Sequence, residues 1–238
     1  VFLKGKYLIN DNLGLTLTYD TQESEGDLNL NSTLGTSGYP QMVSTTSSIG
    51  DDDISRDRIS LSLDFSADSG LFDNGSFSIY SQDTDQRQVT NIDKSIVGNF
   101  VNGPRGPQFV PNIPPTPIRE FKDYIFDQSI DGFAVQFFKS IESESGVVHN
   151  IVYGAEQESI DVSRPRYRTE TNLMTNTVNS NIGGELYPNK TFPDTETERT
   201  AFFINNRIDI SDKTAIVLGA RHDTYKLNIS VDQLFKNV

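Results

Sequence analysis

Residues 58–65 read Arg-Ile-Ser-Leu-Ser-Leu-Asp-Phe, and every second side chain in this stretch is apolar. Residues 13–20, which read Leu-Gly-Leu-Thr-Leu-Thr-Tyr-Asp, show the same alternation. A period of two is typical of a β-strand, because successive side chains of a strand point to opposite faces of its sheet. Each stretch therefore predicts a strand with one apolar face and one polar face.

The same alternation predicts eight strands along the chain. They are expected at residues 2–9, 13–22, 56–66, 75–85, 121–141, 147–160, 198–210 and 214–227. The connections are short at residues 10–12, 67–74, 142–146 and 211–213, and long, polar and rich in Gly or Pro at 23–55, 86–120 and 161–197. Connections in compact domains are usually short. Short turns at one end of the strands and long loops at the other indicate an outer-membrane β-barrel, with periplasmic turns and extracellular loops.

Composition narrows the class of protein further. The chain has 238 residues, no cysteine and a formal net charge of −13. No stretch approaches the roughly 18 consecutive apolar residues of a membrane helix, but a barrel strand needs only about ten residues with every second one apolar. The lack of cysteine excludes disulfides and thiolate metal sites, and the acidic balance disfavours non-specific binding of nucleic acid. Acidic runs such as 51–53 belong either to a solvated surface or to a surface that divalent cations bridge to lipopolysaccharide.

The parity of each strand assigns its side chains to two faces. The side chains expected to meet lipid are Ile59, Leu61, Leu63, Phe65, Phe133, Val135, Phe137, Ile216, Leu218 and Ala220. The side chains expected to face the lumen are Thr16, Thr18, Asp20, Arg58, Asp64, Gly219, Arg221 and Asp223. A lumen filled with water or protein accommodates these polar groups, whereas the dry core of a β-sandwich does not.

No pattern in the chain predicts an enzyme. The two histidines, His149 and His222, have no Cys, no further His and no spaced carboxylates that would complete a metal site. There is neither a G-x-S-x-G turn nor a glycine-rich phosphate loop. We therefore expect no catalytic residue and no metal site, with His149 near the periplasmic rim and His222 on the outer wall.

Two strand pairs in the second half of the chain carry recognisable motifs. Phe192-Pro193-Asp194 precedes a strand containing residues 202–208, and after a tight turn residues 217–227 read Val-Leu-Gly-Ala-Arg-His-Asp-Thr-Tyr-Lys-Leu. The upstream pair contains Arg119, Phe126-Asp127-Gln128, Gly132 and residues 149–154, His-Asn-Ile-Val-Tyr-Gly. Together they resemble the hairpins of the TonB-dependent outer-membrane receptors over residues 119–227. Asn205-Asn206 and His222 depart from the family pattern, which has Gln-Asp and an aromatic residue there.

The resemblance implies a fold and a function. Residues 1–238 would be about eight strands of one 22-stranded antiparallel transmembrane β-barrel domain, without its plug domain and remaining strands. The receptor would lie in the outer membrane of a Gram-negative bacterium and import a scarce nutrient actively. The motifs are most similar to the haem, haemoglobin and transferrin receptor branch, so the expected cargo is haem or another iron carrier such as a ferric siderophore. The segment itself would bind no cofactor.

The implied partners are the plug domain, the TonB complex acting through the plug, outer-membrane lipid and lipopolysaccharide. Two other classes of protein stay open on the residues alone. One is a complete small outer-membrane β-barrel with a structural or adhesive role, and the other is a soluble β-rich adhesin. In a barrel, Gly219 would leave space beside the plug, while Arg221 and Asp223 would pair with each other or with the plug.

Ligand contacts are expected among aromatic and cationic loop residues, because aromatic rings stack on flat ligands and arginine pairs with carboxylates. The candidates are Tyr39, Arg105, Phe109, Arg166, Tyr167 and Arg168. Each of these side chains could instead pack one loop against another. Neither histidine is expected to reach a ligand held above the plug.

Overall fold

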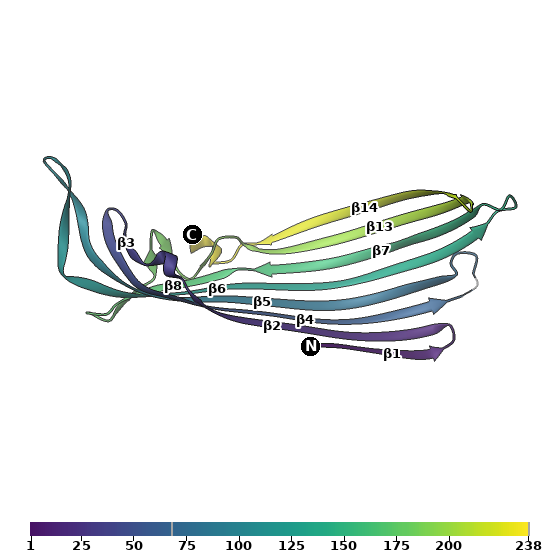
Figure 1. Ribbon diagram of the computed structural model, residues 1–238, viewed down its shortest axis with the longest axis horizontal. Helices are drawn as coiled ribbons and strands as arrows, with labels where there is room; N and C mark the ends of the chain where they lie inside the picture. Colours follow the sequence, from purple (N-terminus) through teal and green to yellow (C-terminus); the bar gives the residue numbers. More distant parts are fainter. Residues whose placement is uncertain (68, 238) are drawn as a thin grey trace.

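The computed structural model describes residues 1–67 and 69–237. Eight long strands lie side by side in an antiparallel sheet, in the order β1-β2-β4-β5-β6-β7-β13-β14 (Figure 1). Their bounds are β1 (Phe2–Asn10), β2 (Leu13–Asn29), β4 (Gln41–Ser66), β5 (Asn74–Gly103), β6 (Gly106–Glu142), β7 (Val148–Ser163), β13 (Asp194–Ser211) and β14 (Thr214–Ser230). Each strand pairs with the next one along the path, so the eight predicted strands and their order are confirmed.

The connections are sorted by length between the two ends of the sheet. The β1–β2, β4–β5, β6–β7 and β13–β14 turns all lie at one end, which we call the short-turn end (Figure 1). The other end, the long-hairpin end, carries the connections between β2 and β4, β5 and β6, and β7 and β13. Asp68, in the second short turn, lies outside the described residues. The predicted separation of short and long connections is therefore confirmed.

The long connections are not the irregular loops that their composition suggested. Strands β4, β5 and β6 contain 26, 30 and 37 residues, so most of 41–55 and 86–120 continues the sheet. In the proline-rich part of β6, before Ile118, residues 106–111 and 116–117 pair with β5 on one edge only, and residues 112–115 lie in a register shift between them. Ile118–Tyr124 also pairs with β8. Proline has no backbone N–H to donate, but at a free strand edge no partner requires that donor. This is why a Pro-rich stretch can extend a strand here.

Smaller elements cluster at the long-hairpin end. They are η1 (Asn31–Thr33), β3 (Gly35–Ser37), β8 (Pro165–Asn172), β9 (Thr177–Asn179), β10 (Asn181–Ile182), β11 (Glu185–Leu186), β12 (Asn189–Lys190) and η2 (Phe235–Asn237). β8 follows β7 after a break at Arg164 and pairs with β6, and β12 folds back to pair with β8. Within the described residues, no helix has the length and apolar character needed to cross a membrane.

The strand register places the predicted lipid-facing residues on one face, which we call the outer face. One cross-strand row on it consists of Leu15, Leu63, Phe77, Val135, Ala155, Phe202 and His222. Large apolar side chains on this face stay open to the surroundings; Leu17 is 50% exposed and Leu218 is 59% exposed. Among the described residues no second large sheet covers them. An exposed apolar face of this kind suits lipid rather than the core of a sandwich.

Aromatic rings mark the outer face near the short-turn end. Phe65, Phe72 and Phe137 pack with ring centroids 5.2 to 6.0 Å apart, and Phe137 stacks on Tyr153 at 5.2 Å. The apolar run from Ile59 to Phe65 extends about 20 Å along its strand. An apolar band about 25 Å tall with flanking aromatic girdles is typical of outer-membrane barrels.

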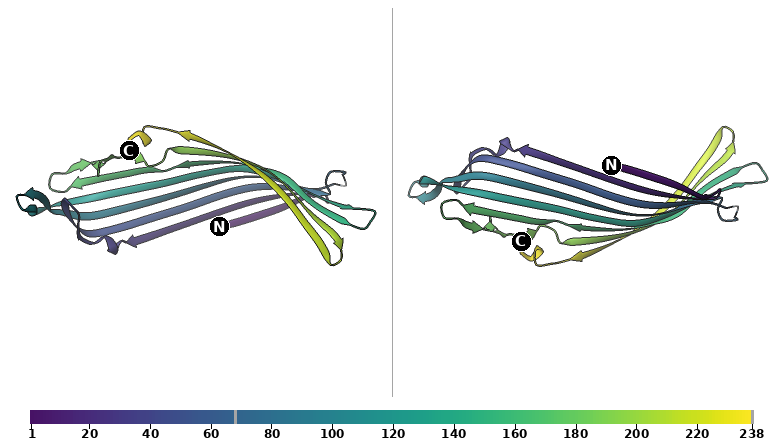
Figure 2. Two further views of the ribbon diagram at one scale, coloured as in Figure 1. Left: turned by 90° about the horizontal axis from the view of Figure 1, so that it is seen from above. Right: turned by 90° about the horizontal axis from the view of Figure 1, so that it is seen from below.

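The sheet is strongly twisted and stays open (Figure 2). β1 pairs only with β2 and β14 only with β13, so the first and last of the described strands do not meet. The right-handed twist common to β-strands produces this curvature. The strands form an arc of barrel wall, which argues against the closed eight-stranded barrel.

Candidate functional site

The face opposite the apolar band, which we call the inner face, is polar. The residues predicted to face the lumen, Thr16, Thr18, Asp20, Arg58, Asp64, Gly219, Arg221 and Asp223, all lie on it by strand register. Arg58 lies directly across from Asp20 on the neighbouring strand. The cross-strand row of side chains that contains Asp64 ends at Arg221 on β14. A surface with this many charged groups needs water, ions or another polar surface against it.

An ionic cluster ties three strands together on the inner face. Arg199 of β13 contacts Glu156 at 3.2 Å and Glu158 at 3.0 Å, both on β7. Arg221 of β14 lies 2.8 Å from Glu156 and 3.0 Å from Asp223, and Asp223 lies 3.5 Å from Arg199. The pairing of Arg221 with Asp223, one of the two expected alternatives, is therefore present within the wall itself.

An aromatic side chain extends this cluster toward the β4 side. The Tyr80 hydroxyl donates a hydrogen bond to Glu158, and the Arg58 guanidinium lies 4.6 Å from the centre of the Tyr80 ring. The ring crosses β6 at Gly132, where an added Cβ would meet its atoms. Glycine is required at this position because the aromatic ring covers the strand there. The polar network consequently runs from β4 to β14.

A buried charge network lies farther along the inner face, at the long-hairpin end. Glu120 of β6 is only 2% exposed. Its carboxylate accepts hydrogen bonds from Lys94 at 2.5 Å and from Arg168 at 2.6 Å, and Lys94 also reaches Glu170 at 2.6 Å. Burial alone would raise the pKa of Glu120, but the hydrogen bonds and charges of these cations outweigh it and lower the pKa. The network fastens β8 onto β5 and β6.

The segment after β9 folds back over β8 and is held by side chains. Arg166 donates to the side-chain oxygen of Asn189 at 2.8 and 3.0 Å and to Glu185 at 3.2 Å. The Tyr187 hydroxyl donates to Glu185 at 2.6 Å. Lys190 is buried and pairs with Asp194 and Asp232, at 2.6 and 2.8 Å. Burial by itself would lower the pKa of Lys190. The two carboxylates raise the pKa by more than burial lowers it, so the pKa of Lys190 lies above its ordinary value.

A cavity of about 450 Å³ opens beside this segment, and we call it the arginine pocket. Its lining includes Gln86, Gln88, Tyr124, Phe126, Arg164, Arg166 and Phe192. Gln88, Tyr124 and Arg166 form one row on the inner face. The Arg164 guanidinium lies 4.7 Å from the centre of the Phe126 ring, and no carboxylate in the described part of the chain pairs with it. The pocket thus offers an available cation next to aromatic rings and side-chain amides.

The structure separates the six candidate ligand contacts into different places. Arg166 lines the arginine pocket, whereas Arg168 is engaged by Glu120 and Tyr167 lies on the opposite side of β8. Tyr39 and Phe109 both pack on Phe100, with centroids 5.5 and 5.4 Å away, near the end of the β5–β6 hairpin. Arg105 is exposed at the tip of that hairpin.

Of the residues that line the pocket, only Arg166 was among the predicted ligand contacts; the most important of those missed are Arg164, Tyr124 and Phe126. Arg164 belongs to the same Arg-Pro-Arg-Tyr-Arg run as Arg166, so its charge was a readable signal. Tyr124 and Phe126 lie within a long strand, and only the pairing of β6 with β8 brings them beside the arginines.

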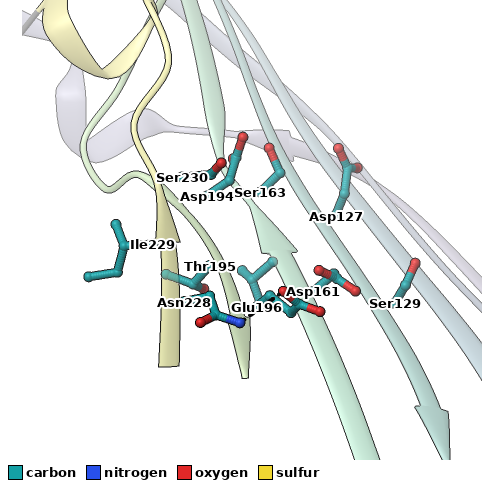
Figure 3. A pocket seen from close by; sticks show the side chains of 11 residues that line it. Asp127, Ser129, Asp161, Ser163, Asp194, Thr195, Glu196, Asn228, Ile229 and Ser230 are labelled. Carbon is teal, nitrogen blue, oxygen red and sulfur yellow. Dashed lines mark hydrogen bonds between the residues drawn. The ribbon is translucent and has the colours of Figure 1, made fainter. Parts of the chain in front are cut away.

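The outer face holds a second cleft, of about 390 Å³, lined mainly by oxygen-bearing side chains (Figure 3). Asp127, Asp161 and Glu196 approach it from β6, β7 and β13. Nowhere in the described ranges are three or more His, Asp or Glu side chains grouped so that they could hold a metal ion. The acidic residues are therefore spread along the wall rather than gathered into a ligand set.

Both histidines lie on the outer face. His149 is at the short-turn end, with its Nδ1 3.1 Å from the Asn206 side-chain amide, and His222 lies across from Phe202. These are the positions expected from strand parity.

An apolar outer face, a charged inner face and turns sorted by length define a transmembrane β-barrel of the outer-membrane type. Residues 3–235 match the family described as TonB dependent receptor-like, beta-barrel. The match covers nearly the whole chain, so the chain belongs to this family. It includes residues 3–118, where only the alternation of apolar and polar residues was informative. No match was found among curated proteins.

Membership of this family fixes several properties. TonB-dependent receptors are active transporters of the Gram-negative outer membrane and not enzymes, and this chain is a segment of such a barrel. The short-turn end is accordingly periplasmic, and the long-hairpin end is extracellular.

Proposed function

We propose that the receptor containing this segment imports an iron carrier, either haem or a ferric siderophore, and holds it against the arginine pocket. The observation that carries this proposal is Arg164, a cation stacked on Phe126 on the inner face near the extracellular end. Haem and many siderophores combine flat rings with anionic oxygen groups. Arginine binds such groups with charge-assisted hydrogen bonds, and Tyr124 and Phe192 add aromatic surface.

The test is Arg164→Gln in the full receptor, with Arg119→Gln as the matched control. Arg119 pairs with Asp93 at 2.9 Å and is not part of the pocket. Loss of one charge-assisted contact should weaken binding of the iron carrier about tenfold in the first variant and leave the control unchanged. Equal affinities of both variants and the parent for haem and for a panel of ferric siderophores would contradict the proposal.

The inner-face ionic cluster is proposed to meet the plug domain. Gly219 supports this, because an added Cβ would make only ordinary van der Waals contacts, with the Asn205 side chain at 3.5 Å and the Ile204 carbonyl oxygen at 3.7 Å, so the wall itself does not require glycine there. A glycine that leaves room on the inner face suits a second protein surface packed close to it. Residues 1–238 would then be one part of a barrel domain whose further strands continue from β1 and β14.

Energy for import is proposed to come from the TonB complex acting on the plug. In cells whose inner-membrane proton gradient is dissipated, the receptor should still bind its carrier but no longer accumulate it. Accumulation that continues without the gradient would contradict this part of the proposal.

A further inference from the structure

Two neighbouring strands present inward side chains without a single charge, and we call this part of the inner face the neutral lane. On β5 it consists of the even-numbered residues from 76 to 88, which are Ser, Ser, Tyr, Gln, Thr, Gln and Gln. On β6 it consists of the even-numbered residues from 124 to 136, which are Tyr, Phe, Gln, Ile, Gly, Ala and Gln. The chain has 33 Asp and Glu and 20 Lys and Arg residues, so a charge-free strip of this length sets the lane apart from the rest of the inner face.

Charged side chains border the lane on both sides. Glu156 and Glu158, on the β7 side, are held by Arg199 in the ionic cluster. Arg58, on the β4 side, makes no ion pair with any described residue. Its guanidinium lies 4.6 Å from the centre of the Tyr80 ring, which places a free cation at the edge of the lane, midway along it.

The polar side chains of the lane are free to bind something other than the wall. The Tyr80 hydroxyl is used by Glu158, and the Tyr80 ring crosses β6 at Gly132. The glutamine, serine and threonine side chains of the lane make no hydrogen bond to any described residue. A glutamine amide both donates and accepts hydrogen bonds, and a hydroxyl does the same. The lane therefore offers a succession of neutral donors and acceptors that water can occupy.

Each end of the lane opens into a cavity. At the extracellular end Gln86 and Gln88 belong to the lining of the arginine pocket. At the periplasmic end Ser76 and Gln136 line a hollow of about 490 Å³ beside the short turns. The lane thus connects the arginine pocket with the periplasmic end along one continuous surface. A passage requires such continuity, whereas a fixed contact between two protein surfaces does not.

We infer that the carrier crosses the outer membrane along the neutral lane, between this part of the wall and the plug. The inference rests on the proposed function, in which the carrier starts from the arginine pocket and the plug packs on the ionic cluster of β7, β13 and β14. A passage must bind its cargo weakly at several successive places, so that the cargo can both enter and leave. Unpaired amides and hydroxyls meet this requirement, and Arg58 attracts an anion at the midpoint.

The chemistry of the lane also selects among iron carriers. Hydrophilic ferric chelates expose amide, hydroxyl and carboxylate groups, which exchange hydrogen bonds with glutamine and serine side chains. Haem presents two large apolar faces instead. Below Phe126 the aliphatic side chains of the lane are only Ile130 and Ala134, too few to cover such a face. The lane therefore suits a hydrophilic ferric chelate better than haem.

The first test blocks the lane with bulk in the full receptor. The variant is Ser78→Trp, and its matched control is Ile79→Trp, whose side chain points to the outer face. The probes are a ferric trihydroxamate, a ferric tricatecholate and haem, each carrying radioactive iron. Uptake by cells and binding to the purified receptor are measured separately. Ser78→Trp should lower chelate uptake about tenfold and leave binding unchanged, and Ile79→Trp should change neither.

A second variant removes hydrogen-bonding groups at nearly constant size, so it serves if the added tryptophan prevents folding. It combines Gln82→Leu with Gln128→Leu, and Gln157→Leu on the outer face of β7 is the matched control. The double variant should lower chelate uptake about fivefold without a change in binding. The control should behave like the wild type. Heat-dependent migration on gels confirms that each barrel has folded.

A third test needs no carrier. Residues 1–238 contain no cysteine, so Ser78→Cys introduces a single thiol into a receptor whose other parts also lack cysteine. Ala201→Cys is the control, because this position is 0% exposed. A water-soluble maleimide should label the purified Ser78→Cys receptor and leave the Ala201→Cys receptor unlabelled. Equal protection of both thiols would mean that the plug covers the lane, and the inference would be wrong.

The uptake measurements can also overturn the inference. Chelate uptake that stays normal in folded Ser78→Trp and in the glutamine double variant would show that the carrier crosses elsewhere. Loss of binding in Ser78→Trp would mean that the plug or the pocket rests on the lane, and preferential uptake of haem would contradict the selection. A wild type that binds none of the three probes refutes the proposed function, and the inference falls with it. Normal binding with uptake that ignores the lane overturns the inference alone.

Discussion

Glu120 shows at the scale of one residue how the extracellular end of the wall is held. A carboxylate that is 2% exposed is tolerated because Lys94 and Arg168 donate to it directly. Removal of one member of a buried charge network leaves the others desolvated without compensation. Glu120 therefore adds a buried ionic contact to the backbone pairing that holds β8 on β6.

Glu120→Gln should destabilise the β6–β8 pairing by about 3 kcal/mol. Hydrogen exchange of residues 118–124 and 165–172 measures this as faster exchange. Glu198→Gln, at an exposed pair with Lys226 3.4 Å away, is the control and should cost less than about 1 kcal/mol. Similar protection of β8 in both variants would refute the role assigned to Glu120.

The stability that Glu120 gives to the β6–β8 pairing should decrease at acidic pH. The pKa of Glu120 is lowered from 4.5 in the folded chain, so its contribution to stability is present above that value. Protection of β8 should be lost as the pH falls below 4.5 and through the lowered pKa. In Glu120→Gln this acid-sensitive step should be absent.

Leu61 tests the assignment of the two faces. It lies in the apolar band, and an arginine there should cost about 2–4 kcal/mol of folding free energy in a bilayer. Ser62→Arg is the neighbouring control; its side chain points to the inner face and should cost much less. Urea titration of receptors refolded into lipid vesicles gives both values. A larger loss for Ser62→Arg than for Leu61→Arg would reverse the faces.

At the scale of elements, the sequence predicted where strands exist better than where they end. The alternation of apolar and polar residues identifies eight strands because the bilayer imposes it directly on the membrane-spanning part. Outside the bilayer both faces are wet, the alternation fades, and the Pro-rich stretch before Ile118 looks like a loop. Its strand conformation comes from pairing with β5, which no local pattern encodes.

The candidate site was predictable to a similar degree. Charge and aromatic content pointed to Arg166 and Arg168, but their roles differ because β8 places Arg168 beside Glu120. Tyr124 and Phe126 enter the pocket only through strand pairing. A site built from several strands depends on register, and register is a property of the sheet rather than of any one segment.

The two kinds of connection should differ in access from outside the cell. Protease added to intact cells should cut at the tip of the β5–β6 hairpin, around Arg105, since this tip is exposed at the extracellular end. The β6–β7 turn, residues 143–147, should be cut only after the outer membrane is opened. Mass spectrometry of the released peptides identifies the sites. Cleavage at residues 143–147 in unbroken cells would invert the orientation of the barrel.

For the whole molecule, the decisive feature is an arc with two free edges and an exposed apolar face. β1 and β14 each present an unpaired row of backbone donors and acceptors, and such edges recruit further strands or aggregate. The apolar band adds a surface that water does not accept. The free edges find partners only when more strands close the barrel, and the apolar band is covered only when lipid surrounds it.

The isolated chain, residues 1–238, should therefore not form a stable monomer in buffer. We expect it to aggregate without detergent, and to remain incompletely protected in hydrogen exchange along β1 and β14 even in detergent, because closure requires partners for both edges. The central strands β4, β5 and β6 have neighbours on both sides over most of the membrane-spanning region and should be the best protected. Light scattering and hydrogen exchange measure the two effects. A sharp, reversible thermal transition of a soluble monomer would show that the eight strands can close on themselves or bury the apolar face, and either result would reject the open-arc description.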